Sequence, residues 1–122
     1  MNAPLRVLIA DDSEPVRQSL RVLLEAEGHE VVGEAPDGRA AVVAALEFEP
    51  DLVIMDWLMP VMDGVTATRE IRARSSVVEV IGFSSREGPE LREQFLQAGA
   101  KACVDKAGVD ALLSAIKALR LT

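Results

Sequence analysis

The sequence predicts an α/β fold in which helices cover both faces of one parallel β-sheet, giving three αβα layers. Short apolar runs alternate with amphipathic stretches along the chain, and regular βα alternation implies right-handed crossovers between parallel strands. The runs at 51–56 and 100–105 carry apolar residues on both faces, as strands do when both sides of a sheet are covered. We therefore expect five strands and five helices.

Each expected element rests on a local pattern. Strands are expected at 5–10, 30–35, 51–56, 78–83 and 100–105, and helices at 14–27, 37–48, 64–73, 89–98 and 109–120. The first helix has a buried stripe at the i, i+4, i+7, i+8 spacing, formed by Val16, Leu20, Leu23 and Leu24. The last two helices have similar stripes, formed by Leu91, Phe95, Leu96, Val109, Leu112, Leu113 and Ile116.

The helix boundaries carry their own signals. Ser13, Asp37 and Asp63 precede the first three helices, where a side-chain oxygen can accept a hydrogen bond from a free backbone N–H. Other boundaries hold residues that suit a first helical turn or a helix end, namely Pro15, Pro89, Gly28 and Gly99.

Length and charge limit the possible functions. The 122 residues are expected to form a single domain over 1–122, because this is an ordinary domain length and no linker or repeat interrupts it. Aromatic residues make up 3% of the chain, so aliphatic side chains must fill the core. A net charge of −7 repels the phosphate backbone, and direct nucleic-acid binding by this chain is not expected.

Single cysteine and histidine residues exclude two further kinds of site. Cys103 is the only cysteine, which rules out an internal disulfide and agrees with a cytoplasmic setting. His29 follows a glycine in an expected surface turn, and with one distant cysteine it cannot make a zinc site. No apolar run approaches the length of a membrane span, so no membrane contact is expected.

Acidic residues follow two of the expected strands. Asp11 and Asp12 end the first apolar run, and Asp56 ends the third. An acidic residue after a strand can simply cap a helix or form a turn, but two adjacent residues cannot both cap one helix. Because ligands of parallel α/β sheets bind at the carboxyl ends of the strands, we expect these three carboxylates to meet there and to need a cation.

Two more polar residues follow the fourth and fifth strands. Ser84 and Lys106 occupy these positions, although each alone can equally be an ordinary strand end or surface residue. Carboxylates suit Mg²⁺, and a lysine with a hydroxyl complements a phosphoryl group. A carboxylate nucleophile would then form an aspartyl phosphate, and Asp56 is the central candidate.

Together these motifs resemble the receiver domain of two-component response regulators. The resemblance runs from Leu5 to Leu121 and rests on five short motifs in a fixed order. They are Asp11-Asp12, Asp56 with Met59-Pro60 and Asp63-Gly64, Ser84-Ser85, Ala98-Gly99-Ala100, and Lys106. The resemblance implies a flavodoxin-like, doubly wound sheet of strand order 2-1-3-4-5.

The family also implies a role for each residue that matches a motif. Asp56 would accept a phosphoryl group from a sensor histidine kinase or phosphotransfer protein, in a signalling reaction rather than as an enzyme. Asp12 would bind Mg²⁺ directly, Asp11 through water, and Leu58 through its backbone carbonyl. Ser84 would be the switch hydroxyl that moves onto the phosphoryl group, and Lys106 the lysine that pairs with it.

The sequence departs from the family pattern at two positions. Cys103 stands where the family usually has tyrosine or phenylalanine, and we expect an ordinary thiol there. Ala107 stands where the family usually has a proline in a cis peptide bond. A non-proline cis bond costs about 3–4 kcal/mol, so a trans bond and a shifted loop are expected.

Phosphoryl lifetime in the family depends on the residues two positions after the acceptor and after the switch hydroxyl, here Leu58 and Arg86. Leu58 cannot orient a water by hydrogen bonding, so we expect slow self-dephosphorylation.

Two alternative functions would require other residues. A small phosphatase or phosphotransferase with an aspartyl-phosphate intermediate would commonly have an acidic residue two positions after the nucleophile, where this chain has Leu58. A flavodoxin-like redox protein would need a phosphate-binding loop less acidic than residues 11–14.

Several biological forms remain open. The chain can be a stand-alone regulator, the receiver of a longer DNA-binding regulator, which residues 31–38 resemble, or a degenerate receiver that works without phosphate. Partner contact is expected on the face formed by residues 89–120, and a phosphorylation-dependent dimer is possible. The sequence identifies neither the kinase nor the stimulus.

Overall fold

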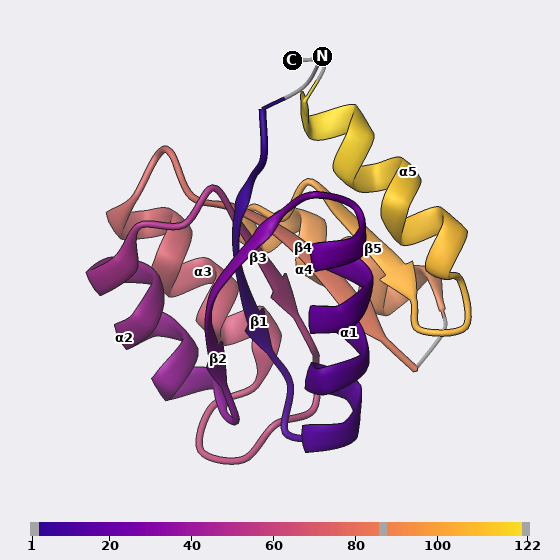
Figure 1. The fold of residues 1–122 in the computed structure, drawn as a ribbon. Helices are drawn as coiled ribbons and strands as arrows, with labels where there is room; N and C mark the ends of the chain where they lie inside the picture. The colour runs from indigo at the N-terminus through magenta and orange to yellow at the C-terminus, as the bar shows by residue number, and fades with distance from the viewer. Residues whose placement is uncertain (1–2, 86–87, 121–122) are drawn as a thin grey trace.

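The computed structural model describes residues 3–85 and 88–120, and within these ranges five strands and five helices alternate in chain order (Figure 1). The strands are β1 (Arg6–Ala10), β2 (Glu30–Ala35), β3 (Leu52–Met55), β4 (Glu79–Ser84) and β5 (Ala102–Asp105). The helices are α1 (Glu14–Ala26), α2 (Gly38–Phe48), α3 (Gly64–Arg74), α4 (Pro89–Ala98) and α5 (Val109–Arg120). All the elements expected from the sequence are present, with ends that differ by two residues at most.

The sheet has the predicted strand order, β2-β1-β3-β4-β5, and all its strands are parallel. The order reverses between β1 and β3, which is where ligands of such sheets bind. In the register of the two strands Ala10 lies beside Met55, so the next residues, Asp11 and Asp56, leave the sheet side by side. A one-residue irregularity shifts the pairing of β1 with β2 between Val7 and Leu8.

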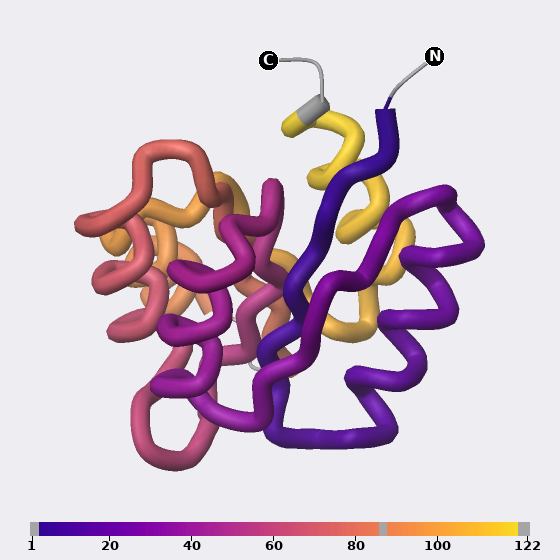
Figure 2. Tube along the Cα trace, turned by 60° about the vertical axis from the view of Figure 1, so that its left-hand side comes forward, coloured from indigo at the N-terminus to yellow at the C-terminus, as the bar shows by residue number. Residues whose placement is uncertain are grey.

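Two hydrophobic clusters lie on opposite faces of the sheet. Residues of α1 and α5 pack with Val7 and Ile9 on one face, and residues of α2, α3 and α4 pack with Leu8 and Ala10 on the other. This alternation along β1 is the period of a strand. The two views of the chain show the helices divided between the two sides, as predicted for three αβα layers (Figures 1 and 2).

The predicted helix caps are confirmed. Side-chain oxygens of Ser13, Asp37 and Asp63 accept hydrogen bonds from the backbone N–H three residues later, at 3.4, 2.8 and 2.9 Å. Gly99 ends α4 with a φ of 112°, which favours glycine. The second helix begins at Gly38 rather than 37 because Asp37 is its cap.

One expectation about exposure was wrong, and one was confirmed. His29 is buried, with 6% of its surface exposed, and its Nδ1 accepts a hydrogen bond from the N–H of Leu5 at 3.1 Å. The turn at Gly28 directs the imidazole against the chain that enters β1 instead of toward water. Strand β5 is the edge of the sheet and all four of its residues are partly exposed, but it is covered on both faces as expected, because Cys103 packs against one hydrophobic cluster and Ala102 and Val104 against the other.

Among the described residues, no helix is both long enough and apolar enough to cross a bilayer.

Candidate phosphoacceptor site

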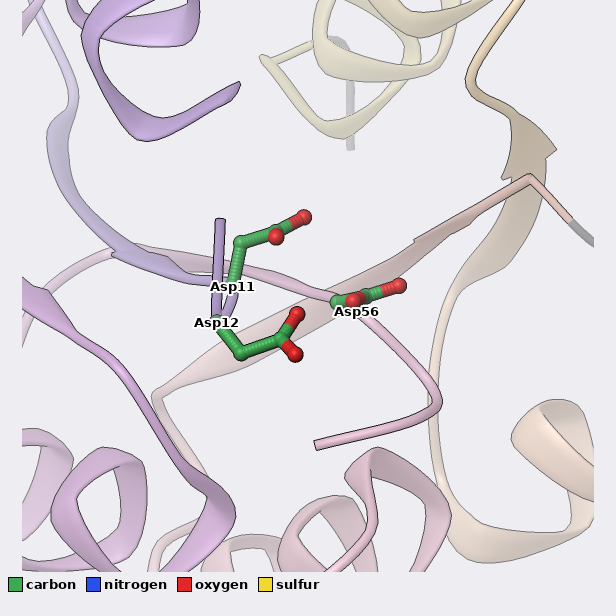
Figure 3. A group of neighbouring side chains, drawn as sticks. All are labelled: Asp11, Asp12 and Asp56. Atoms are coloured by element: carbon green, nitrogen blue, oxygen red, sulfur yellow. The ribbon is translucent and has the colours of Figure 1, made fainter. Parts of the chain in front are cut away.

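Three carboxylates meet at the carboxyl ends of β1 and β3. Oxygen atoms of Asp11, Asp12 and Asp56 all lie within 4.8 Å of one another, and Figure 3 shows the three side chains gathered between the two loops. Asp11 and Asp56 are 1% and 7% exposed, whereas Asp12 is exposed. The cluster is therefore closed toward the sheet and open toward solvent on the side of Asp12.

Backbone hydrogen bonds hold the two buried carboxylates in place. The N–H of Asp56 donates to the carbonyl of Ala10 at 2.9 Å, and the N–H of Asp11 donates to the carbonyl of Ala35 at 3.0 Å. Both contacts continue the strand pairing one residue beyond the strands. Oδ1 of Asp56 also accepts from the N–H of Trp57 at 2.9 Å, and Oδ1 of Asp11 accepts from the N–H of Ser13 at 2.9 Å. The carboxylates thus have little freedom to separate.

Lys106 is the cation of the site. Its Nζ lies 2.6 Å from Oδ2 of Asp11 and 3.3 Å from Oδ1 of Asp56. Its backbone N–H donates to the carbonyl of Ser84 at 2.9 Å, which holds the loop after β5 against the end of β4. The described residues contain no cis peptide bond, so the trans bond expected before Ala107 is confirmed.

Burial and charge shift two of the ionisation equilibria in the site. Burial raises the pKa of the Asp56 carboxyl group, and the negative charge of Asp11 raises it further, against the lowering effects of Lys106 and the Trp57 N–H. For Lys106, burial opposes the charged form, but its contacts with Asp11 and Asp56 outweigh burial and raise the pKa. Two acidic groups thus share one ammonium group, and the site can accept further positive charge.

The loop between β3 and α3 packs closely against Asp56. A Cβ atom built on Gly64 would overlap the backbone carbonyl oxygen of Asp56, and the N–H of Gly64 donates to the carbonyl of Trp57 at 2.7 Å. Only glycine fits here. In the sequence Gly64 is part of the Asp63-Gly64 motif, and the structure adds this close approach to Asp56, which links α3 directly to the site.

Ser84 and Leu58 occupy two further positions near the carboxyl ends of the strands. Ser84 ends β4 beside Asp105 and is buried. Leu58 lies two residues beyond Asp56 with 53% of its surface exposed. Arg86, the second residue expected to influence phosphoryl lifetime, lies outside the described residues.

Cys103 is a half-buried free thiol on the outer strand β5. Burial raises the pKa of this thiol, and the positive charge of Arg92 opposes that effect. A thiol with a raised pKa is protonated at neutral pH and is a weak nucleophile. The structure therefore supports the ordinary thiol expected from the sequence.

Arg17 contacts the site and was missed in the sequence. Its guanidinium group donates to the backbone carbonyl of Asp11 at 2.7 Å and to Glu34 at 2.9 Å. The only signal in the sequence was an arginine near the start of a helix and a glutamate in a neighbouring strand. Such a pair is too common to indicate a site.

The sequence matches the family described as response regulator receiver domain over residues 7–117. This chain belongs to that family. As a receiver domain it is a signalling phosphoacceptor of two-component systems rather than an enzyme with a separate substrate, and its Asp11–Asp12–Asp56 pocket is typical of phosphoaccepting response regulators. Receiver domains interact with kinases and partner proteins.

Known proteins agree with this assignment. The transcriptional regulatory protein PdtaR of Mycobacterium tuberculosis is 45% identical over 105 residues, which are 84% of this chain and 50% of that protein. The chemotaxis protein CheY of Bacillus subtilis is 41% identical over 96 residues, which are 79% of this chain and 80% of that protein. The chain thus spans about half the length of the first relative and most of the second.

One similar solved structure contains a metal. It is the crystal structure of the CheX–CheY–BeF3–Mg²⁺ complex from Borrelia burgdorferi, with a TM-score of 0.83 and 29% identity. The match covers 95% of this chain and 89% of that chain.

Proposed function

We propose that this receiver domain accepts a phosphoryl group on Asp56 in a reaction that depends on Mg²⁺. The proposal is carried by one observation. Carboxylate oxygens of Asp56, Asp11 and Asp12 lie within 4.8 Å of one another, while the ammonium group of Lys106 lies 3.3 Å from Asp56. A nucleophile, a cation-binding pair and a fixed positive charge then surround one point, which is what phosphoryl transfer requires.

The donor set fits magnesium. Mg²⁺ prefers one or two carboxylates together with waters and phosphate oxygens, and the acidic triad provides such ligands on a side open to solvent. When bound, the ion would supply positive charge that offsets the repulsion between the carboxylates and the phosphoryl oxygens. Asp12 would bind it directly, Asp11 through water, and Leu58 through its backbone carbonyl. The similarity to a receiver solved with Mg²⁺ supports this choice of metal.

Asp56 is the nucleophile in this proposal. One of its carboxylate oxygens, Oδ1, accepts hydrogen bonds from Trp57 and Lys106, while Oδ2 accepts none from the described residues. An oxygen of Asp56 would attack phosphorus as the phosphorus–nitrogen bond of a phosphohistidine breaks, and the electron pair would return to the imidazole. Lys106 would then pair with the transferred group, and the Ser84 hydroxyl would move onto it as the switch.

The partners are proposed at the level of class. A sensor histidine kinase or phosphotransfer protein would supply the phosphoryl group, and an output domain or target protein would bind the face formed by residues 89–120. That face contains a groove of about 770 Å³ between α4 and β5, lined in part by Leu91, Leu96 and Cys103. A phosphorylation-dependent dimer on this face, no direct nucleic-acid contact and a cytoplasmic location complete the proposal.

The test is phosphorylation by a small donor. The protein is incubated with MgCl₂ and acetyl phosphate, beside Asp56→Asn, and an acid-stable, base-labile adduct is sought by mass spectrometry. We expect an adduct on the wild type alone, and none when a chelator removes the metal. An unmodified wild type with intact Mg²⁺ binding would favour a degenerate receiver that binds its partners without phosphate.

A further inference from the structure

One guanidinium group braces the loop that carries Asp11 and Asp12. Arg17 lies near the start of α1, and its Nη1 donates to the backbone carbonyl of Asp11 at 2.7 Å. Its Nε donates to Oε1 of Glu34 in β2 at 2.9 Å. The side chain of Arg17 is only 15% exposed, so the planar group is held between the loop and the neighbouring strand.

The bond to the Asp11 carbonyl acts on the peptide unit that leads to Asp12. The other polar atoms of Asp11 are held by Ala35, Ser13 and Lys106, and none of these contacts fixes that peptide unit. The carboxylate of Asp12 is exposed, and within residues 3–85 and 88–120 it has no hydrogen bond or ion pair of its own. The backbone therefore sets where this side chain starts, and the carbonyl of the Asp11–Asp12 peptide unit accepts a hydrogen bond from Arg17.

We propose that Arg17 is a positioning residue for the cation site, and that it aims the Asp12 carboxylate by fixing the Asp11–Asp12 peptide unit. This inference rests on the proposed function, because it assumes that the acidic cluster binds Mg²⁺. Arg17 contacts neither the expected metal position nor the acceptor carboxylate, and it acts through the loop.

Charge alone would give Arg17 the opposite effect. A positive charge close to a cation site repels the cation, so removing that charge should tighten Mg²⁺ binding if electrostatics were the whole effect. Glu34 offsets this repulsion. Burial opposes its ionisation, but hydrogen bonds from Arg21 and Arg17 outweigh burial and lower the pKa of this carboxyl group. The direction of the change in Mg²⁺ affinity thus separates positioning from charge.

Arg21 provides a matched control on the same helix. It lies one turn after Arg17 and contacts the same carboxylate, with Nη2 2.8 Å from Oε2 of Glu34. Its other ion pair is with Glu25 and not with the loop. Arg21→Gln therefore removes the same charge and a bond to the same partner, but leaves the Asp11 carbonyl untouched.

The experiment is an NMR titration of the metal-free protein with MgCl₂, followed through the backbone amides of Asp12 and Trp57. Wild type, Arg17→Gln and Arg21→Gln are compared, with Asp12→Asn as the control that removes a ligand. Arg17→Lys is a second substitution, because it keeps the positive charge but lacks the planar guanidinium group that bonds the loop and Glu34 together. Thermal unfolding establishes that each variant is folded at the titration temperature.

We expect Arg17→Gln to raise the Kd for Mg²⁺ about tenfold, the lower end of the range for residues that hold a metal ligand in place. Its Asp12 amide should also shift before any metal is added. Arg17→Lys should weaken binding as well, and Arg21→Gln should leave the Kd unchanged or lower it.

Two results would overturn the inference in distinguishable ways. If the wild type binds Mg²⁺ and both Arg17 variants bind it equally well or more tightly, Arg17 does not position the site and the proposed function stands. If the wild type itself does not bind Mg²⁺, the proposed function and the inference fail together.

Discussion

The two sides of the acidic site are built differently. The acceptor side comes from β1 and β3 with the loops that follow them, which we call the central region. These strands lie inside the sheet, with Val7 to Ala10 and Leu52 to Met55 buried. The lysine side comes from β5, α4 and the loop before α5, which we call the edge region. There every strand residue is partly exposed, and α4 and β5 line a groove of about 770 Å³.

The different packing of the two regions suits them to different functions. In the central region, backbone bonds at Asp11 and Asp56 and the close approach of Gly64 leave the carboxylates one arrangement. The edge region has the open space and the free edge that allow side chains to rearrange. Phosphoryl chemistry needs fixed positions, whereas a signal needs a second arrangement of some element. Lys106 links the two regions, because it belongs to the edge region and its ammonium group contacts Asp11 and Asp56 in the central region.

The largest expected effect would come from adding one methyl group in the central region. Gly64→Ala would force a Cβ atom into the Asp56 carbonyl, and we expect the free energy of unfolding to fall by about 3 kcal/mol. Gly108→Ala is the matched change in the edge region, where the nearest atoms would lie at 3.3 and 3.4 Å. It should cost less than about 1 kcal/mol. Urea unfolding measures both, and equal costs would remove the contrast between the regions.

Phosphoryl lifetime offers the next test. Leu58→Asn would place a group able to orient water two residues from the acceptor, and we expect phosphorylated protein to hydrolyse about tenfold faster, equivalent to about 1.4 kcal/mol in the barrier. Val61→Asn is the control, since Val61 is the other exposed large apolar residue of the same loop. Loss of the adduct with time is followed by mass spectrometry. An unchanged rate for Leu58→Asn would count against slow self-dephosphorylation.

Stability against pH tests the strain of the central carboxylates. Because the pKa of Asp56 is raised in the folded state, the folded protein holds this proton more tightly than the unfolded chain. The resulting stability is complete below about pH 4, the ordinary carboxyl pKa, and is lost as pH rises through the raised folded value. Asp56→Asn should therefore be more stable than wild type at pH 7, by about 1 kcal/mol.

The advantage of Asp56→Asn should shrink toward pH 3.5 or so, where the wild-type carboxyl group is protonated. Adding MgCl₂ should stabilise the wild type more than the variant, because the metal binds the folded state through this carboxylate. Thermal unfolding across the pH range checks both statements. A variant less stable than wild type at pH 7 would show that Lys106 compensates fully for the burial of Asp56.

The smallest effect is expected in the edge region. Cys103→Phe would place a ring beside an open groove, and we expect the free energy of unfolding to change by less than about 1 kcal/mol. Ala45→Phe places the same ring on α2 at a position that is fully buried against the sheet, and it should cost about 3 kcal/mol. Comparable losses for the two variants would mean that the edge region is as tightly packed as the core around Ala45.

Local features of this chain were predictable from its sequence, but among long-range contacts only those that the topology of a parallel sheet brings together were. Caps such as Asp37 and Asp63 act on a backbone N–H three residues away, so a short segment contains the whole interaction. The meeting of Asp11, Asp12 and Asp56 followed from one topological rule about parallel strands. The burial of His29 depends on Leu5, and the role of Arg17 depends on Glu34, at separations of 24 and 17 residues. No pattern in the intervening sequence indicates such pairs.

The position of Glu34 also affects how molecules of this protein behave toward one another. Strand β2 is an outer strand of the sheet, and an exposed outer strand is a template on which another chain can add a strand. Here the strand pairs irregularly with β1 and carries a carboxylate held in place by two arginines. Charges and irregular pairing are both features that discourage strand addition. The carboxylate that takes part in holding the acidic loop therefore also places a charge on an outer strand of the sheet, where charges discourage the addition of a further strand.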